Sequence, residues 1–105
     1  MADVQHDAFA AIEVLDEVES TNRELMARAR AGAPHGSALR ARSQTAGGGR
    51  SSQGWTSPEG GLFLSVLIKP RVPDRVLPGI PVACGIGVVN ALEALGCADI
   101  KLKWP

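Results

Sequence analysis

Apolar and polar residues alternate with two different periods along the first half of the chain. A partial period of two in residues 9–18 predicts a strand, at the least from Ala11 onward. Helical spacing follows from about Thr21, and Gly32 stands where a left-handed residue would end a helix. Residues 37–43 alternate again. The pattern therefore predicts a strand, a helix and a second strand.

The second half of the chain repeats this order. A nearly continuous apolar run at residues 61–68 is typical of a central strand buried on both faces. Residues 71–78 contain two prolines and predict a surface connection. Residues 82–95 predict an apolar helix that packs against the sheet and ends at Gly96. Residues 98–104 alternate again, which predicts a half-buried strand and, with the rest, an α/β fold.

The first predicted helix begins with a group of hydroxyl and amide side chains. Thr21 and Glu24 have the spacing of a capping box, in which the hydroxyl and the carboxylate each bond a free backbone N–H. The same helix start, with Ser20, Thr21 and Asn22, could instead bind a carbonyl group or an anion. The sequence leaves a structural cap and a ligand site open.

Composition and charge narrow the possible functions. The chain has 105 residues, of which 45% are hydrophobic and 21% charged, as in one soluble globular domain or part of one. Eleven basic and eleven acidic residues cancel, so the chain has no overall field that would attract nucleic acid or an anionic membrane. Any phosphate binding must be local, and Arg50 is the candidate cation.

The cysteine pattern favours a reducing compartment. Cys84 and Cys97 lack the spacing of a metal or redox motif, and His6 and His35 are isolated from them. We therefore expect two buried thiols, no disulfide and no zinc site. No signal peptide is visible, and the most apolar run, residues 80–89, is too short to span a membrane. These features predict a cytoplasmic protein.

A glycine-rich segment at residues 44–58 is the strongest candidate for chemistry. It has four glycines between Gly47 and Gly54 and one fixed cation, Arg50. Glycine lets backbone N–H groups approach a ligand closely, so we expect a loop that is mobile when empty and ordered when occupied.

Three known phosphate-binding patterns do not fit this segment. A Walker A loop would need a lysine where Trp55 follows Gly54, and a dinucleotide fingerprint would need a glycine at Ser52. An Arg-Gly tract that binds RNA would repeat Arg50. The segment could be a simple hairpin-like connection, or Gln44, Arg50 and Trp55 could supply an amide, a cation and an apolar lid to a ligand.

Four short motifs occur in order along the chain. They are Ser20-Thr21-Asn22, Gln44-Thr45-Ala46-Gly-x-Gly-Arg50, Trp55-x-Ser57-Pro58-x-Gly60-Gly61-Leu62-Phe63-Leu64-Ser65 and Lys103-Trp104-Pro105. Together they closely resemble the biotin protein ligases, the enzymes that join biotin to a lysine of the biotin carboxyl carrier protein. The resemblance spans nearly the whole chain and is far more specific than any one motif.

The resemblance implies both a fold and a reaction. The family's catalytic domain is α/β, a mixed sheet with packed helices, and is related to class II aminoacyl-tRNA synthetases. It condenses biotin with MgATP to biotinyl-5′-adenylate, releases pyrophosphate and transfers the biotinyl group to the carrier lysine. Biotin and ATP are therefore the implied substrates, and the carrier protein is the implied partner.

The resemblance also implies roles for individual residues. Arg50 would meet the phosphate as the catalytic cation, Trp55 would cover the adenylate, and Lys103 could lie on the nucleotide side. A reactive acyl adenylate must be held in place and kept from water, which these roles would achieve without a protein nucleophile. The implied biotin-binding residues are Ser20, Thr21, Asn22, Gln44, Gly47, Gly48, Gly49 and Arg50.

The chain departs from the family in its glycine-rich segment. Family members commonly read Gly-Arg-Gly-Arg followed by another Gly-Arg. Here Gly48 replaces the first arginine, and Ser52 and Gln53 stand where the second Gly-Arg pair would be. The segment thus carries two fewer positive charges, and we expect it to retain the adenylate more weakly.

The chain also stops before other family motifs. The family continues from Lys-Trp-Pro into Asn-Asp, whose carboxylate serves nucleotide and metal binding, and later supplies a lysine near biotin and phosphate. We therefore expect a loose N-terminus at residues 1–8 and the first half of a catalytic domain at residues 9–105, with the Mg²⁺ ligands elsewhere. The short N-terminus predicts no helix-turn-helix domain and no DNA binding. An exposed sheet edge would favour self-association, so a homodimer is compatible with the sequence.

Two alternatives remain open. A lipoate-type protein ligase would share the fold and the class of reaction, although the segment from Gln44 to Trp55 and the Lys103-Trp104-Pro105 motif favour biotin. A non-catalytic biotin-binding fragment would bind biotin without adenylating it.

Overall fold

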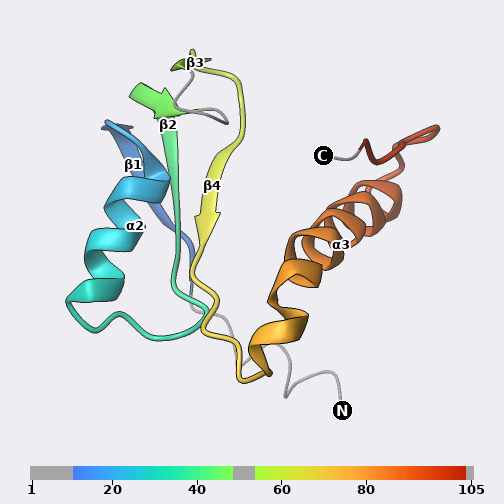
Figure 1. Ribbon diagram of the computed structural model, residues 1–105. Helices are drawn as coiled ribbons and strands as arrows, with labels where there is room; N and C mark the ends of the chain where they lie inside the picture. The colour runs from blue at the N-terminus through green and yellow to red at the C-terminus, as the bar shows by residue number, and fades with distance from the viewer. Residues whose placement is uncertain (1–10, 49–53, 104–105) are drawn as a thin grey trace. The chain divides into compact units, whose positions relative to one another are not determined.

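A computed structural model describes residues 11–48 and 54–103 of the chain, which fall into two compact units, Met1–Lys69 and Pro70–Pro105. Each unit is described by itself. The first contains a sheet and one helix, and the second contains a 3₁₀ helix that leads into an α-helix (Figure 1). In chain order the elements are β1 (Glu13–Val18), α2 (Thr21–Arg30), β2 (Ala38–Gly48), β3 (Gly54–Ser57), β4 (Phe63–Val66), the 3₁₀ helix Asp74–Gly79 and α3 (Ile80–Ala94).

The sheet of the first unit is mixed, with β2 at its centre. β1 pairs parallel to β2, and α2 forms the connection between them. β3 and β4 pair antiparallel to different parts of β2, so that β3 lies at its carboxyl end and β4 runs back along its start. Figure 1 shows α2 beside this sheet, where it contacts β2 and β4. This arrangement confirms the mixed sheet with a packed helix.

The core of the first unit is small. Among the described residues, three apolar side chains are buried: Leu25 of α2, and Leu39 and Ala41 of β2. Leu39 is 0% exposed. Because side chains alternate along a strand, β2 can direct Leu39 and Ala41 to the same face, the one that α2 covers.

The prediction that residues 61–68 are buried on both faces is wrong. Ser65 of β4 is buried and bonded to α2, but its neighbours Leu64 and Val66 are 40% and 41% exposed. The alternation of a strand places these two residues on the sheet face opposite α2. Within the first unit, one face of β4 is covered and the other is open.

The ends of α2 agree only in part with those predicted from the sequence. Ser20, and not Thr21, is the N-cap residue, and its Oγ accepts a hydrogen bond of 3.3 Å from the backbone N–H of Arg23. Glu24 does not complete the predicted capping box with Thr21: the backbone N–H of Thr21 donates to Gln44, and the carboxylate of Glu24 accepts a bond from Arg28. At the other end the predicted stop is confirmed: Gly32 has a φ of 103°, and its N–H bonds the carbonyl of Ala29.

The second unit contains α3, whose predicted stop is also confirmed. Gly96 has a φ of 95°, and the N–H groups of Gly96 and Cys97 bond the carbonyls of Glu93 and Leu92, as in a Schellman motif. The prediction that the two cysteines are buried is wrong, because Cys84 and Cys97 are both exposed. No residue of α3 is buried, which accounts for the exposure of Cys84.

The strand expected at residues 98–104 is not formed over its described part, residues 98–103. Its alternating residues could form a strand only beside a partner, and no described strand pairs with them. Leu102 instead packs on α3: a Cβ added to Gly85 would lie 2.9 Å from the Cδ1 atom of Leu102. Gly85 therefore makes room for this side chain.

The helical stretch Asp74–Ala94 is longer than the apolar run considered in the sequence. Its 21 residues are long and apolar enough, by length and composition, to cross a membrane, so the exclusion based on residues 80–89 does not hold. The core helix of a soluble protein meets the same criterion, and length and composition therefore assign this stretch no membrane role.

An ion-pair cluster ties α2 to β1. Arg28 lies 2.8 Å from a carboxylate oxygen of Glu13 on β1 and 3.0 Å from one of Glu24 in its own helix. The hydrogen bond and charge of Arg28 lower the pKa of Glu13, and the two carboxylates raise the pKa of Arg28. The pair is solvent-accessible, so water and salt screen it.

Replacing Glu13 with glutamine should remove a pH-dependent part of the stability of the first unit. Because the pKa of Glu13 is lower in the folded state than its ordinary value of 4.5, its contribution is present above that value. The contribution is lost as the pH falls through the lower pKa of the folded state. The urea midpoints of wild type and Glu13→Gln should therefore differ at neutral pH and converge once the pH lies below the lowered pKa of Glu13.

Asp16→Asn is the matched control, because it also removes a carboxylate of β1 that pairs with an arginine, Arg42. The Asp16 side chain is 95% exposed, so this variant should follow the wild-type pH profile. A wild-type advantage over Glu13→Gln that persists undiminished in acid would contradict the assignment.

Candidate functional site

A hydrogen-bonded cluster surrounds the start of α2. The backbone N–H of Thr21 donates to Oε1 of Gln44 on β2 over 2.8 Å, and Nε2 of Gln44 donates to Oγ of Ser57 on β3 over 3.0 Å. The amide of Gln44 thus joins the helix to β3, with both of its polar atoms engaged. Gln44 therefore lies beside Thr21.

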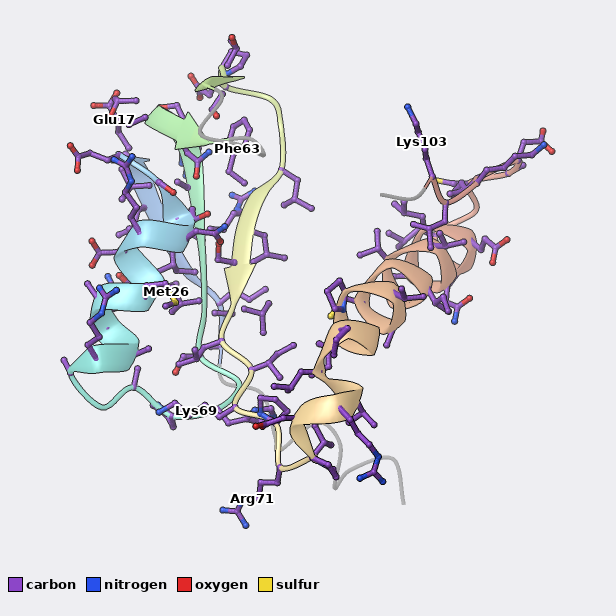
Figure 2. All side chains as sticks on the ribbon, in the orientation of Figure 1. Glu17, Met26, Phe63, Lys69, Arg71 and Lys103 are labelled. Atoms are coloured by element: carbon purple, nitrogen blue, oxygen red, sulfur yellow. The ribbon has the colours of Figure 1, made fainter. Side chains whose placement is uncertain are left out.

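Ser65 connects the same helix start to β4. The hydroxyls of Thr21 and Ser65 lie 2.8 Å apart, and Oγ of Ser65 donates to Oδ1 of Asn22. In the sequence, Ser65 lies 43 residues after Asn22 and 44 residues after Thr21. Figure 2 shows the side chains of this region, with Phe63, two residues before Ser65, at the start of β4. The cluster therefore spans α2 and three strands of one sheet.

Most of this polar cluster is buried. Thr21, Ser57 and Ser65 are 4%, 5% and 7% exposed, whereas Asn22 is exposed. A buried hydroxyl without a partner would cost about 1 to 3 kcal/mol. Within the described ranges, no buried side-chain oxygen or nitrogen lacks a hydrogen-bond partner. The cluster is therefore a satisfied network with one exposed member, Asn22.

Ser20 faces a different environment from Thr21. Its hydroxyl caps α2 and lines an open hollow of about 260 Å³. Close by, the N–H of Ala46 donates to the carbonyl of Glu19 over 2.8 Å, which holds the beginning of the glycine-rich segment against the residues before α2. The hollow is lined by Val18, Glu19, Ser20, Arg23, Glu24 and Ala27.

The glycine-rich segment begins and ends as a β-hairpin. Gly47 pairs with Trp55 and Gly48 with Gly54, after a register shift between Gln44 and Gly47. The two ends of the segment are thus held in the sheet, and Gln44 lies where the register changes. The predictions for Gly49 and Arg50 lie outside the described residues, as does the side chain of Trp55.

Lys103 belongs to the second unit, where it is exposed (Figure 2). Of the site residues predicted from the sequence, the structure brings Thr21, Asn22 and Gln44 together in one cluster. Ser20 directly precedes Thr21 in the chain. The nucleotide-side role of Lys103 stays a prediction.

Two members of the cluster were missed as site residues from the sequence. Ser57 and Ser65 were noted only as parts of a motif. A signal was available for Ser65, because it is the one hydroxyl in the apolar run of residues 61–68, and a buried hydroxyl needs a hydrogen-bond partner. Ser57, in a short strand before Pro58, offers no such contrast with its neighbours.

The donor set of the cluster consists of hydroxyls and carboxamides. Within residues 11–48 and 54–103 there is no group of three or more histidine, cysteine or acidic side chains that could hold a metal ion. The polar cluster itself contains no carboxylate, and we place no metal-dependent step on it.

Comparison with known proteins identifies the family. The model of the biotin/lipoate A/B protein ligase family matches residues 14–105, which include the whole polar cluster. The chain belongs to this family. Its sequence relatives include the bifunctional ligase/repressor BirA of Bacillus spizizenii, 34% identical over 91 residues, and the biotin–[acetyl-CoA-carboxylase] ligase of Mycobacterium tuberculosis, 36% identical over 100 residues.

Solved biotin protein ligases share the fold of this family member. The Aquifex aeolicus enzyme in complex with biotin and ATP is 37% identical, with a TM-score of 0.79 over 92% of this chain and 40% of that one. The Leishmania major enzyme in complex with biotinyl-5-AMP is 34% identical, with a TM-score of 0.66 over 80% of this chain and 34% of that one.

The chain spans only part of its relatives. It covers 28% of the Bacillus spizizenii protein and 38% of the Mycobacterium tuberculosis protein, while 86% and 90% of this chain are matched. The matched region thus corresponds to less than half of each relative.

Replacing Gln44 with alanine should destabilise the first unit. The change removes the acceptor for the Thr21 amide and the donor to Ser57, so we expect a loss of about 2 kcal/mol in the free energy of unfolding. Gln44→Glu keeps an acceptor and puts a negative charge at the start of α2, so it should recover part of the loss. Urea unfolding measures both.

Thr45→Ala serves as the neighbouring control, because Thr45 is exposed on the same strand. It should cost less than about 0.5 kcal/mol. If Gln44→Ala is no more harmful than Thr45→Ala, the amide of Gln44 does not hold the helix start.

Proposed function

We propose that this chain supplies the biotin-binding part of an ATP-dependent biotin protein ligase. The reaction would join biotin to ATP as biotinyl-5′-adenylate and then transfer the biotinyl group to a lysine of a biotin carboxyl carrier protein. The observation that carries the proposal is the cluster of Thr21, Asn22 and Gln44 at the start of α2. The likeness to the Aquifex aeolicus enzyme, solved with biotin and ATP, supports the same reading.

The proposed site uses the polar groups of the cluster for binding and orientation. The start of α2 has a partial positive charge that suits a carbonyl oxygen, although the N–H groups of Thr21 and Arg23 are already bonded within the protein. Asn22 is the exposed member of the cluster and offers an amide to the polar head of biotin. The network behind Asn22 is already formed, so little order would have to be gained on binding.

The proposed chemistry needs no nucleophile from the protein. The biotin carboxylate would attack the α-phosphate of ATP, and pyrophosphate would leave. The carrier amine would then attack the acyl carbon, AMP would leave with the bonding electrons, and the amine would lose a proton. We propose that the hairpin segment with Arg50 closes on the phosphate, which would stabilise charge and exclude water.

Two other functions fit some of the same observations. A lipoate-type ligase is compatible with the family, whose description covers lipoate as well as biotin ligases. A binding module would use the same cluster without adenylation. The names of the sequence relatives and the biotin complexes of the structural neighbours favour the biotin ligase.

Biotin-dependent exchange of pyrophosphate into ATP tests this proposal on the purified full-length protein. We expect exchange that requires biotin and that lipoate does not support. Thr21→Val removes a hydroxyl of the cluster and should raise the KM for biotin about tenfold. Thr56→Val makes the same change at an exposed residue of β3 and should leave the KM unchanged.

The alternatives give different results in the same assay. Exchange with lipoate in preference to biotin would identify a lipoate ligase. Biotin binding by calorimetry without exchange would identify a binding module, and a folded protein with neither activity would refute all three functions.

Restoring an arginine at Gly48 should slow the release of biotinyl-adenylate several-fold. Gly48 is exposed at the end of β2, and a Cβ added there meets no atom within 4 Å, so the larger side chain can be accommodated. The added charge should attract the phosphate of the adenylate. Release of labelled adenylate from the isolated complex measures the effect.

Gly48→Gln provides the control, since it adds a long polar side chain without the charge. Slower release in Gly48→Arg alone would assign the effect to charge. An equal release rate in wild type and Gly48→Arg would mean that Gly48 does not weaken retention of the adenylate.

A further inference from the structure

We propose that Ser65, held by Thr21, is a positioning residue that orients Asn22 for ligand binding. Ser65 lies on β4, is 7% exposed and contacts both residues through one hydroxyl group. Asn22, in contrast, is exposed at the start of α2. A buried side chain thus controls the orientation of an exposed one. The inference rests on the proposed function, because biotin is the ligand used to test it.

The proton of Ser65 sets the direction of the hydrogen bonds. A serine hydroxyl has one proton to donate, and Ser65 donates it to Oδ1 of Asn22. In its contact of 2.8 Å with Thr21, the oxygen of Ser65 must therefore accept, and Thr21 must donate. The relay runs from Thr21 through Ser65 to Asn22, with a single arrangement of protons.

This direction determines what Asn22 offers to a ligand. Its Oδ1 is engaged by Ser65, so Nδ2 is the part of the amide that remains for a ligand acceptor. Without Ser65 the amide of Asn22 could rotate and present either oxygen or nitrogen. Fixing it before binding removes the entropic cost of ordering this side chain on binding.

Thr21 holds the other end of the relay in place. Its backbone N–H is bonded to Gln44, and its hydroxyl is bonded to Ser65, so Thr21 is held from β2 and from β4. Thr21 is 4% exposed, so these two bonds lie away from solvent. Ser65 therefore receives its hydrogen bond from a fixed donor, which makes its own orientation unique.

A double-mutant cycle on the purified full-length protein tests whether Ser65 acts through Asn22. Ser65→Ala should raise the Kd for biotin about tenfold, and Asn22→Ala should raise it by a similar factor. In the Asn22→Ala background, adding Ser65→Ala should change the Kd by less than about twofold, because the side chain that it orients is gone. The KM for ATP should stay at its wild-type value throughout.

Further variants separate positioning from folding. Calorimetric stoichiometry gives the fraction of competent protein, so a Kd is measured even where Ser65→Ala lowers stability. Ser65→Thr keeps the hydroxyl and should restore the Kd to within about threefold of wild type. Ser37→Ala removes a serine hydroxyl that bonds the carbonyl of Pro34, away from the cluster, and should leave the Kd unchanged.

The outcomes distinguish this inference from the proposed function. A tenfold effect of Ser65→Ala that disappears in the Asn22→Ala background supports the positioning role. Biotin binding with equal effects of Ser65→Ala in both backgrounds would overturn the role and leave the proposed function standing. A folded wild-type protein that does not bind biotin would overturn both.

Discussion

The two hydrogen bonds of Thr21 hold the start of α2 against β2 and β4 at the same time. Its backbone N–H is bonded to Gln44 and its hydroxyl to Ser65. Among the described residues of the first unit, the buried apolar side chains Leu25, Leu39 and Ala41 supply only a small core. Directional bonds therefore decide how the helix sits on the sheet, because three buried apolar side chains alone would tolerate small shifts of the helix.

This arrangement changes what the start of α2 can do for a ligand. The amide of Gln44 takes the N–H of Thr21, and the hydroxyl of Ser20 takes that of Arg23. Two of the helix's first N–H groups are therefore bonded within the protein and are not free for an anion. Recognition at this position must depend more on side chains such as Asn22 than on the bare helix terminus. The hairpin of β2 and β3 holds both ends of the segment that contains Arg50 in the sheet.

The sequence predicted the elements whose signals are local. The strands around Glu13–Val18 and Ala38–Gly48, the helix between them and its stop at Gly32 all follow from periodicity and a single glycine. Features that depend on distant partners were not predicted. β2 extends to Gly48 because β3 pairs with it, and residues 98–103 pair with no described strand. Likewise Ser20 is the N-cap of α2, while the hydroxyl of Thr21 bonds Ser65, which lies 44 residues further along the chain.

The candidate site also combines residues that the sequence predicted with contacts that depend on distant partners. Motif resemblance selected Thr21, Asn22 and Gln44, which the structure places together, but it could not show how their polar groups are paired. That pairing depends on Ser57 and Ser65, which reach the cluster from two other strands. A serine in a strand carries no local sign of the atom that it will bond. The role of Ser65 becomes visible only in the structure, where its buried hydroxyl bonds Thr21 and engages Oδ1 of Asn22.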